Sequence, residues 1–350
     1  MEGVKFVLEI RKRDDFYLIR PDKITRPLDV NLIKKVLGSM RRALEIEVIN
    51  SNIELSPYRP PVASLYDKKI EDFEEVEFPY DRVAVEVGFG SGRHLLHQAK
   101  EHPDRLHIGL EIHTPSAQQV LRQISIGGLE NVWVVNYDAR LLIEMLPSNV
   151  CEAIFVHFPV PWDKKPHRRV IGEKFLEESM RVLSPGGYLE LRTDSEKYYR
   201  YALEVFSSPE KISFLVEKNR DLPVVSKYEA RWKRMNKNIY NITVHSTEIS
   251  EEKVMREDFA FERKASFEKL ESLPKESKVY GGCFVKFGDY MVMSDGTGGV
   301  VECSFGSFDR PERRYLFVSA DGNISYFPGR PVRTSANIEA HKRIGGWIYV

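Results

Sequence analysis

Five apolar runs alternate with amphipathic segments between residues 82 and 193. The runs are RVAVEVG, LHIGLEI, VWVVNY, AIFVHF and YLELRT, and helix-like stretches such as SAQQVLRQI and EKFLEESMRVL separate them. Near-continuous apolar strands with helices between them indicate a parallel sheet that is covered on both faces. Two later runs, ISFLVEK and NIYNITVHS, are candidates for the far edge of that sheet. We therefore predict an α/β core over residues 60–247.

The two ends of the chain follow other patterns. Residues 1–59 hold two short β-like stretches, VKFVLEI and DDFYLIR, and then a helical pattern with apolar residues three or four apart. A proline-bearing, acidic linker with one short helix leads into the core. Residues 248–350 begin with a charged helical segment, FERKASFEKLESL, and continue as short strands separated by Asp-Gly turns. Such turns indicate hairpins, so we predict a β-rich C-terminal domain.

Charge and cysteine usage narrow the class of protein. Lys plus Arg equals Asp plus Glu, at 52 each, so any attraction to nucleic acid must be local. Residues 1–42 hold such an excess, with 11 Lys/Arg against 6 Asp/Glu. Cys151, Cys283 and Cys303 form no C-x-x-C pair, and the histidines match no metal motif, so buried thiols and no metal are expected. No apolar run reaches the roughly 18 residues of a membrane span. A cytoplasmic protein is the default, and the sequence leaves the oligomeric state open.

A glycine loop follows the first strand of the predicted core. In VAVEVGFGSGRHLL, Glu86, Gly88, Gly90 and Gly92 lie where the strand turns into a helix. Glycine allows a positive φ and a close approach of backbone to a ligand. The dinucleotide fingerprint G-x-G-x-x-G would need a small residue at the position of Arg93, so NAD is disfavoured. An acid two residues before the first glycine suits the sulfonium and ammonium groups of S-adenosylmethionine.

Two further carboxylates follow the next strands. Glu111 ends the second strand, where it can accept hydrogen bonds from two ribose hydroxyls. Asp138 follows the third strand in NYDA and can accept from an adenine amino group. Together with Glu86 these acids form one constellation at successive strand ends. The alternative is that each carboxylate only caps the helix or turn that follows it.

The loop FPVPWDKKPHRR, residues 158–169, follows the fourth strand. In open α/β sheets this strand flanks the ligand crevice, so the loop lies where an acceptor would meet the methyl donor. Its two prolines stiffen it, and Trp162 can stack or pack. The loop carries four cations that can pair with phosphates: Lys164, Lys165, Arg168 and Arg169. The alternative is a packed proline-aromatic corner with a solvated cationic face.

These motifs together resemble the bacterial tRNA (guanine-N7-)-methyltransferases. That family reads F-P-D-P-W-x-K-x-R/K-H-x-x-R-R after the fourth strand, and residues 158–169 match it closely. The glycine loop, GLEI, NYDA, VLSPGGYLELRTD and SKYEARW match as well, so the resemblance covers residues 60–245. It implies a class I S-adenosylmethionine-dependent methyltransferase fold, Rossmann-like, with a mostly parallel seven-stranded sheet.

The resemblance also implies roles for single residues. Contacts to S-adenosylmethionine fall on the glycine loop, Glu86, Glu111 and Asp138, and on position 160, where Val160 replaces the usual Asp. The target guanosine and its surroundings would be bound by Lys164, Asp194, Ser226, Tyr228 and Glu229. To this substrate-binding set we add Trp162 and Arg168 of the loop, for their stacking and phosphate-pairing chemistry. The basic segment KYEARWKRMNK would extend a track for folded RNA.

The predicted reaction is methyl transfer to N7 of a guanosine in tRNA, in the variable loop as the family suggests. Guanine N7 has an in-plane lone pair and no proton, so its attack needs no general base. We therefore expect activity despite Val160, with Asp194, or less favourably Asp163, as the carboxylate near the developing cation. The alternatives are a methyltransferase of another RNA or a protein, and a tRNA-binding protein that lost its chemistry with the missing Asp.

Overall fold

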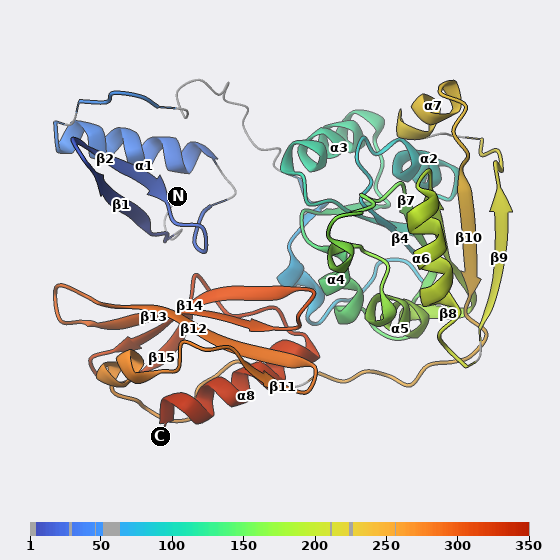
Figure 1. Ribbon diagram of the computed structural model, residues 1–350. Coiled ribbons are helices and arrows are strands. Elements are labelled where there is room, and N and C mark those ends of the chain that lie inside the picture. The colour runs from blue at the N-terminus through green and yellow to red at the C-terminus, as the bar shows by residue number, and fades with distance from the viewer. Residues whose placement is uncertain are drawn as a thin grey trace. The chain divides into compact units, whose positions relative to one another are not determined.

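An eight-stranded sheet organises the unit that spans Val62–Met255. The computed structural model describes residues 5–27, 30–45, 47–51, 64–210, 212–223, 227–255 and 257–349. The strand order is β3-β6-β5-β4-β7-β8-β10-β9, of which β4, β7, β8, β9 and β10 are labelled in Figure 1. The strands are β3 (Asp67–Lys68), β4 (Val83–Val87), β5 (Leu106–Leu110), β6 (Val132–Val135), β7 (Cys151–His157), β8 (Leu183–Thr193), β9 (Ser213–Lys218) and β10 (Tyr240–His245).

The sheet confirms the predicted class I methyltransferase fold. All neighbours from β3 to β8 pair in parallel, and β10 runs antiparallel to both β8 and β9. Strands β9 and β10 close the far edge, as the late apolar runs predicted. The two-residue strand β3 adds an eighth strand at the opposite edge, beyond the seven that were expected.

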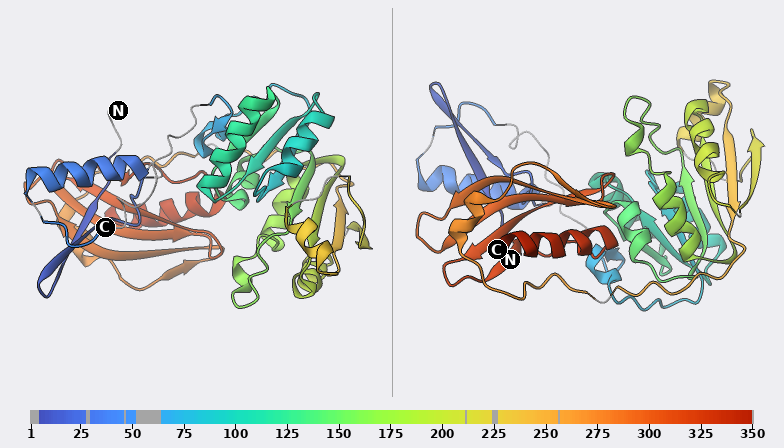
Figure 2. Two further views of the ribbon diagram at one scale, coloured as in Figure 1. Left: turned by 90° about the horizontal axis from the view of Figure 1, so that it is seen from above. Right: turned by 60° about the horizontal axis from the view of Figure 1, so that its bottom comes forward.

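Helices cover both faces of this sheet (Figures 1 and 2). Helices α2 and α3 pack on one face, against β5 and β6, while α4, α5 and α6 lie together on the other. The helical elements are η1 (Ile70–Phe73), α2 (Arg93–Glu101), α3 (Thr114–Gly127), α4 (Ala139–Met145), η2 (Pro166–Arg168), α5 (Glu173–Val182), α6 (Glu196–Phe206) and α7 (Lys227–Arg234). The apolar runs are thus buried on both sides, which explains why they do not alternate with polar residues.

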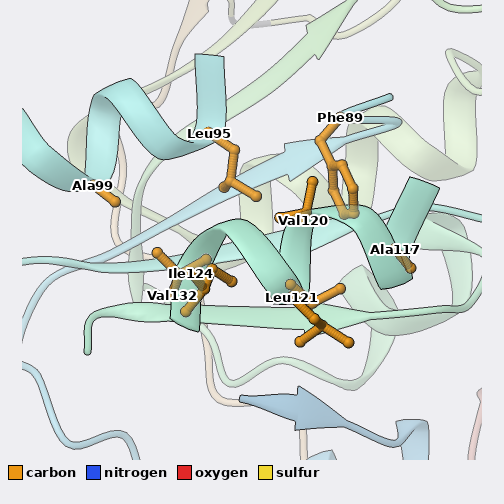
Figure 3. Packing of buried hydrophobic residues seen from close by; sticks show 9 residues of the cluster. Phe89, Leu95, Ala99, Ala117, Val120, Leu121, Ile124 and Val132 are labelled. Carbon is orange, nitrogen blue, oxygen red and sulfur yellow. The ribbon is translucent and has the colours of Figure 1, made fainter. Parts of the chain in front are cut away.

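The packing of α2 against α3 sets the shape of the glycine loop. Phe89 and Leu95 pack with Val120 and neighbouring apolar side chains in a cluster that is closed to solvent (Figure 3). Gly92 enters α2 with φ +72°, and a Cβ placed on it would lie 2.4 Å from Val120 Cγ2. Gly92 is therefore required both by its backbone conformation and by the closeness of α3.

The second compact unit joins both ends of the chain, Met1–Pro61 and Arg256–Val350. In its first part, β1 (Leu8–Arg13) and β2 (Phe16–Pro21) form a hairpin that precedes α1 (Val30–Ala43). Its second part is a five-stranded antiparallel sheet with a terminal helix: β11 (Lys278–Tyr280), β12 (Cys283–Val292), β13 (Gly298–Gly306), β14 (Pro311–Ser319), β15 (Ile324–Phe327) and α8 (Ser335–Tyr349). The Tyr315 hydroxyl donates to Asp22 Oδ1 at 3.1 Å and so connects the two parts.

The predicted β-rich C-terminal region is confirmed, with two corrections. Asp-Gly turns join β12 to β13 and β14 to β15, as expected. The charged segment 261–273 is not a regular helix, because the Ala265 N–H bonds the Gly322 carbonyl and only the 3₁₀ turn η3 (Phe267–Ser272) forms. Helix α8 was not predicted, since Gly345 and Gly346 lower its helix propensity. The division of the chain at residues 59 and 247 stays a prediction.

Two further sequence expectations concern the cysteines and membrane-spanning helices. All three cysteines are free and buried, as predicted. None of the helices in the described part of the chain combines the length and the apolarity that a bilayer crossing requires.

Replacing Gly92 by Ala should destabilise the protein strongly. The left-handed backbone and the contact with Val120 together cost roughly 2–5 kcal/mol. Gly127→Ala is the matched control, because its added Cβ meets no atom closer than Leu129 Cγ at 3.7 Å. It should change the free energy of unfolding by less than about 1 kcal/mol. Urea unfolding of both variants measures this, and a Gly92→Ala protein as stable as the Gly127→Ala protein would contradict the packing described.

Candidate functional site

The carboxyl ends of the central strands meet at one edge of the sheet. Val87 of β4 pairs with Leu110 of β5 and with Val156 of β7, and Val156 pairs in turn with Leu191 of β8. The strand order reverses between β4 and β7, because β5 and β6 follow on one side and β7 and β8 on the other. Ligands of open α/β sheets bind in the crevice at this reversal.

The glycine loop offers exposed backbone at the reversal. Gly88, Gly90 and Gly92 have φ values of 71°, 54° and 72°. A Cβ on Gly88 would meet nothing within 4 Å, so a ligand can approach the backbone there. The Glu111 carboxylate joins this loop to the next, since its Oε2 accepts from Gly90 N–H at 3.0 Å and its Oε1 from His113 N–H at 2.9 Å. The open backbone beside a fixed carboxylate fits the ribose end of an adenosyl group.

Ile112 is a candidate site residue that the sequence analysis did not name. Its side chain is 76% exposed although it directly follows the buried strand β5 and Glu111. An exposed apolar residue beside the expected ribose position is suited to pack against an adenine ring. The signal in the sequence was the isoleucine after the acid in GLEI.

Glu86 has a partner inside the protein. It is 4% exposed, and its Oε2 lies 2.8 Å from Nδ1 of His94 on α2. Burial disfavours the charged imidazole, but the Glu86 carboxylate outweighs burial and raises the pKa of His94 above its usual value. The sequence analysis found only that the histidines match no metal motif, so the pairing of His94 with Glu86 was not foreseen.

Asp138 caps the helix that follows it. Its Oδ1 accepts from the Arg140 N–H at 3.0 Å, and the Arg140 guanidinium reaches Oδ2 at 2.7 Å. This is the capping arrangement that the sequence analysis kept as the alternative. A contact of Asp138 with adenine stays a prediction.

The loop of residues 158–169 after β7, hereafter called the proline loop, has a strained backbone. Phe158 and Trp162 have φ values of 51° and 46°, which side chains of this size rarely adopt. Arg169 closes the loop: its Nε donates to the Pro161 carbonyl at 2.8 Å, and its guanidinium stacks 4.5 Å from the Tyr201 ring centroid. The expectation that Arg169 pairs with phosphate is wrong, because its side chain is buried in these contacts.

The outer side of the same loop is open to solvent. Val160 is 60% exposed and Trp162 37%, and Lys164 and Arg168 are exposed as well. The Arg168 guanidinium lies 5.2 Å from the Trp162 ring centroid. Position 160 therefore carries an uncharged side chain that faces outward beside a cation–aromatic pair.

A fully buried arginine connects the end of β8 to α7. Arg192 donates from Nη2 to Glu229 Oε1 at 2.8 Å and to the Arg220 carbonyl at 3.1 Å, and from Nη1 to Asn241 Oδ1 at 3.2 Å. Its carbonyl accepts from Phe158 N–H at 2.8 Å. Arg192 thus touches both the proline loop and the segment expected to bind guanosine.

Two of the predicted guanosine-binding groups have no described geometry. Ser226 lies outside the described residues, as does the side chain of Tyr228. Glu229 is buried against Arg192. Its contact with guanosine stays a prediction.

His157 and Glu190 form a second buried pair under the proline loop. His157 Nε2 lies 2.8 Å from Glu190 Oε1, and the His157 ring centroid is 4.5 Å from that of His94. Burial lowers the pKa of His157, although Glu190 acts in the opposite direction. Burial opposes ionisation of Glu190, but His157 and nearby arginines prevail and lower the pKa of that carboxyl. The partners of Glu190 therefore favour its ionised form.

Asp194 follows β8 directly and reaches the surface. Its side chain is 20% exposed, and Lys237 donates to its Oδ2 at 3.0 Å. Asp194 follows the end of β8, which pairs with β7 on one side and with β10 on the other. In the described part of the chain, no group of three or more His, Cys, Asp or Glu side chains is arranged to hold a metal ion.

Comparisons with known proteins decide the family. A family model described as "Putative methyltransferase" matches residues 81–242. A tRNA (guanine-N(7)-)-methyltransferase of Wolinella succinogenes is 40% identical over 99% of this chain and 89% of its own length. The chain belongs to the tRNA (guanine-N7-)-methyltransferase family. Relatives of the same name from Helicobacter hepaticus and Helicobacter pylori (strain HPAG1) are 36% and 37% identical, over 93% and 96% of this chain and 83% and 85% of theirs.

Solved structures are more distant. The 16S rRNA methyltransferase KamB is 18% identical and matches 51% of this chain and 92% of its own, with a TM-score of 0.37. A likeness of this size carries no argument about function. Family membership, as predicted from the motifs, is confirmed by the relatives named above.

Removal of the Arg192 side chain should destabilise this member of the tRNA (guanine-N7-)-methyltransferase family. Arg192→Met leaves Glu229 buried and without its guanidinium, which costs about 3–5 kcal/mol of unfolding free energy. The double variant Arg192→Met/Glu229→Met removes both charges and should recover most of that loss. Urea unfolding measures both proteins. A double variant that is less stable than Arg192→Met would show that the pair is not the source of the cost.

Proposed function

We propose that this protein transfers the methyl group of S-adenosylmethionine to N7 of a guanosine in the variable loop of tRNA. The observation that carries the proposal is the meeting of the glycine loop, Glu111 and the proline loop at the reversal of strand order. Membership of the tRNA (guanine-N7-)-methyltransferase family supports it over nearly the whole chain. Because its substrate is tRNA, we place its action in the cytoplasm.

The donor side of the site is assigned to the loops after β4, β5 and β6. The open backbone at Gly88 and Gly90 accommodates the donor, Glu111 accepts from the ribose hydroxyls, and Ile112 packs on the adenine. The buried Glu86 contributes negative charge to the donor side, and its pairing with His94 partly offsets that charge. The bound donor supplies a methyl group activated by a sulfonium.

The acceptor side is assigned to the loops after β7 and β8. Guanine N7 attacks through its lone pair, so the protein must align the base rather than remove a proton. The purine becomes positively charged as the methyl group arrives. Asp194 is the carboxylate that stabilises this charge, because Val160 offers none and Asp194 lies at the adjacent strand end.

Recognition of the folded RNA is assigned to exposed cations around the site. Lys164 and Arg168 project from the proline loop, and α7 carries further basic residues beyond Glu229. Phosphate contacts of this kind position an RNA without reading its sequence. Binding of tRNA should therefore weaken as salt concentration rises.

Methylation of unmodified tRNA tests the proposed function. The protein, incubated with labelled S-adenosylmethionine and tRNA, should produce 7-methylguanosine, identified after digestion to nucleosides. The same assay applied to Asp194→Ala should show kcat lowered by a factor on the order of 10², because the cationic purine loses its nearest carboxylate.

Asp163→Ala is the matched control for this variant. Asp163 is the other carboxylate near the loop, but it is half-exposed and faces Arg169 at 3.6 Å. It should keep most of the activity. Full turnover by Asp194→Ala would contradict the role of Asp194, whereas label in another nucleoside, or in protein, would contradict the assigned reaction.

A further inference from the structure

The end of α7 turns the chain back over Asp194. After Arg234 the helix stops, and Asn236 adopts a left-handed conformation with φ 52°. Lys237 N–H then donates to the Trp232 carbonyl at 3.1 Å, five residues back. This pattern is the Schellman type of helix end, in which the residue after the left-handed one packs against the last turn. The side chain of Lys237 is thereby directed along Trp232.

The Lys237 ammonium is fixed from two sides. It lies 3.7 Å from the Trp232 ring centroid and 3.0 Å from Asp194 Oδ2. A cation over an indole ring is held electrostatically by the ring face. The Lys237 side chain is nevertheless 41% exposed, compared with 20% for Asp194. Lys237 therefore covers the carboxylate and remains open to solvent itself.

The arginines of α7 near Lys237 have other contacts. Arg231 lies 5.1 Å from the same Trp232 ring, and Arg234 Nε donates to the Ala230 carbonyl at 3.3 Å. Of the cations whose side chains are described in this segment, Lys237 is the one paired with Asp194. Its position is thus specific to the end of β8, where the acceptor base is expected.

A carboxylate at an RNA-binding site creates a conflict of charge. Asp194 is needed near the methylated purine, but its negative charge repels the phosphates of the incoming RNA. An ammonium group has three donors, of which one is directed at Asp194. The others can reach phosphate oxygens from several directions, since lysine acts on phosphate as a point charge.

We propose that Lys237 is a tRNA-binding residue of the guanosine site that bridges Asp194 to the phosphate of the target nucleotide. The proposal rests on the proposed function, because it takes Asp194 as the carboxylate beside the acceptor base. It assigns to Lys237 two effects: it offsets the repulsion between Asp194 and the RNA backbone, and it places the target nucleotide.

Charge-removing variants of Lys237 test the bridge. Lys237→Met and Lys237→Gln should each raise the KM for tRNA about 10-fold, the loss expected for one charge-assisted contact. The slope of log Kd for tRNA against log salt concentration should fall by about 1, because one phosphate contact is lost. The affinity for S-adenosylmethionine, measured by calorimetry, should stay within about twofold of wild type, since Lys237 lies on the acceptor side.

Lys100→Met is the matched control. Lys100 is an exposed lysine in the last turn of α2, at the end of that helix opposite the glycine loop. Its removal deletes the same charge from the same unit and should leave KM and the salt slope unchanged. Lys237→Arg, which keeps the charge and can stack on Trp232, should restore the slope even if thermal stability drops.

The outcomes separate this inference from the proposed function. If the wild-type protein methylates tRNA but Lys237→Met and Lys237→Gln behave like Lys100→Met, the bridge is overturned. If Lys237→Arg loses as much of the salt slope as Lys237→Met, the role is structural and the bridge is also overturned. If no 7-methylguanosine forms at all, the proposed function fails, and direct tRNA binding at graded salt still decides whether Lys237 contacts phosphate.

Discussion

The whole site depends on one constraint, which is that neighbouring parallel strands end side by side at the same edge of the sheet. Because β5, β4, β7 and β8 are in register, residues from 88 to 194 reach one edge of the sheet although they are far apart in the chain. The Phe158 N–H to Arg192 carbonyl bond extends this alignment past the last ladder pair. The proposed donor-binding and acceptor-binding loops can therefore lie next to each other without any long loop having to fold between them.

Beneath that edge, the α2 side of the sheet carries buried charged and polar pairs in addition to its apolar cluster. The pairs Glu86–His94, His157–Glu190 and Arg192–Glu229 lie under the glycine loop, the proline loop and α7 respectively. Burying ions is unfavourable unless each has its partner and hydrogen bonds. Paired as they are, they fix the direction of three separate elements around one site.

The parts of the fold that were predictable are those with local causes. Apolar runs, the glycines at a strand end and the acid in GLEI lie within a few residues of the features they produce. The partners of Arg192 and His94 depend instead on strand register and on where α2 and α7 pack, so the sequence offered no local signal for them. Arg169 looked like another loop cation, and only the closure of the loop on Tyr201 shows it to be buried. Helix α8 forms despite paired glycines because its apolar face is buried.

The central claim is that an adenosyl methyl donor binds at these strand ends, with Glu111 on its ribose. Calorimetric titration of the protein with S-adenosylhomocysteine, for wild type and Glu111→Gln, tests it most directly. We predict one binding site per chain in the wild type and affinity lowered about 10-fold or more in Glu111→Gln, since a charged hydrogen-bond acceptor is lost. A wild-type protein that binds no such ligand, or a Glu111→Gln variant that binds it equally well, would contradict the account.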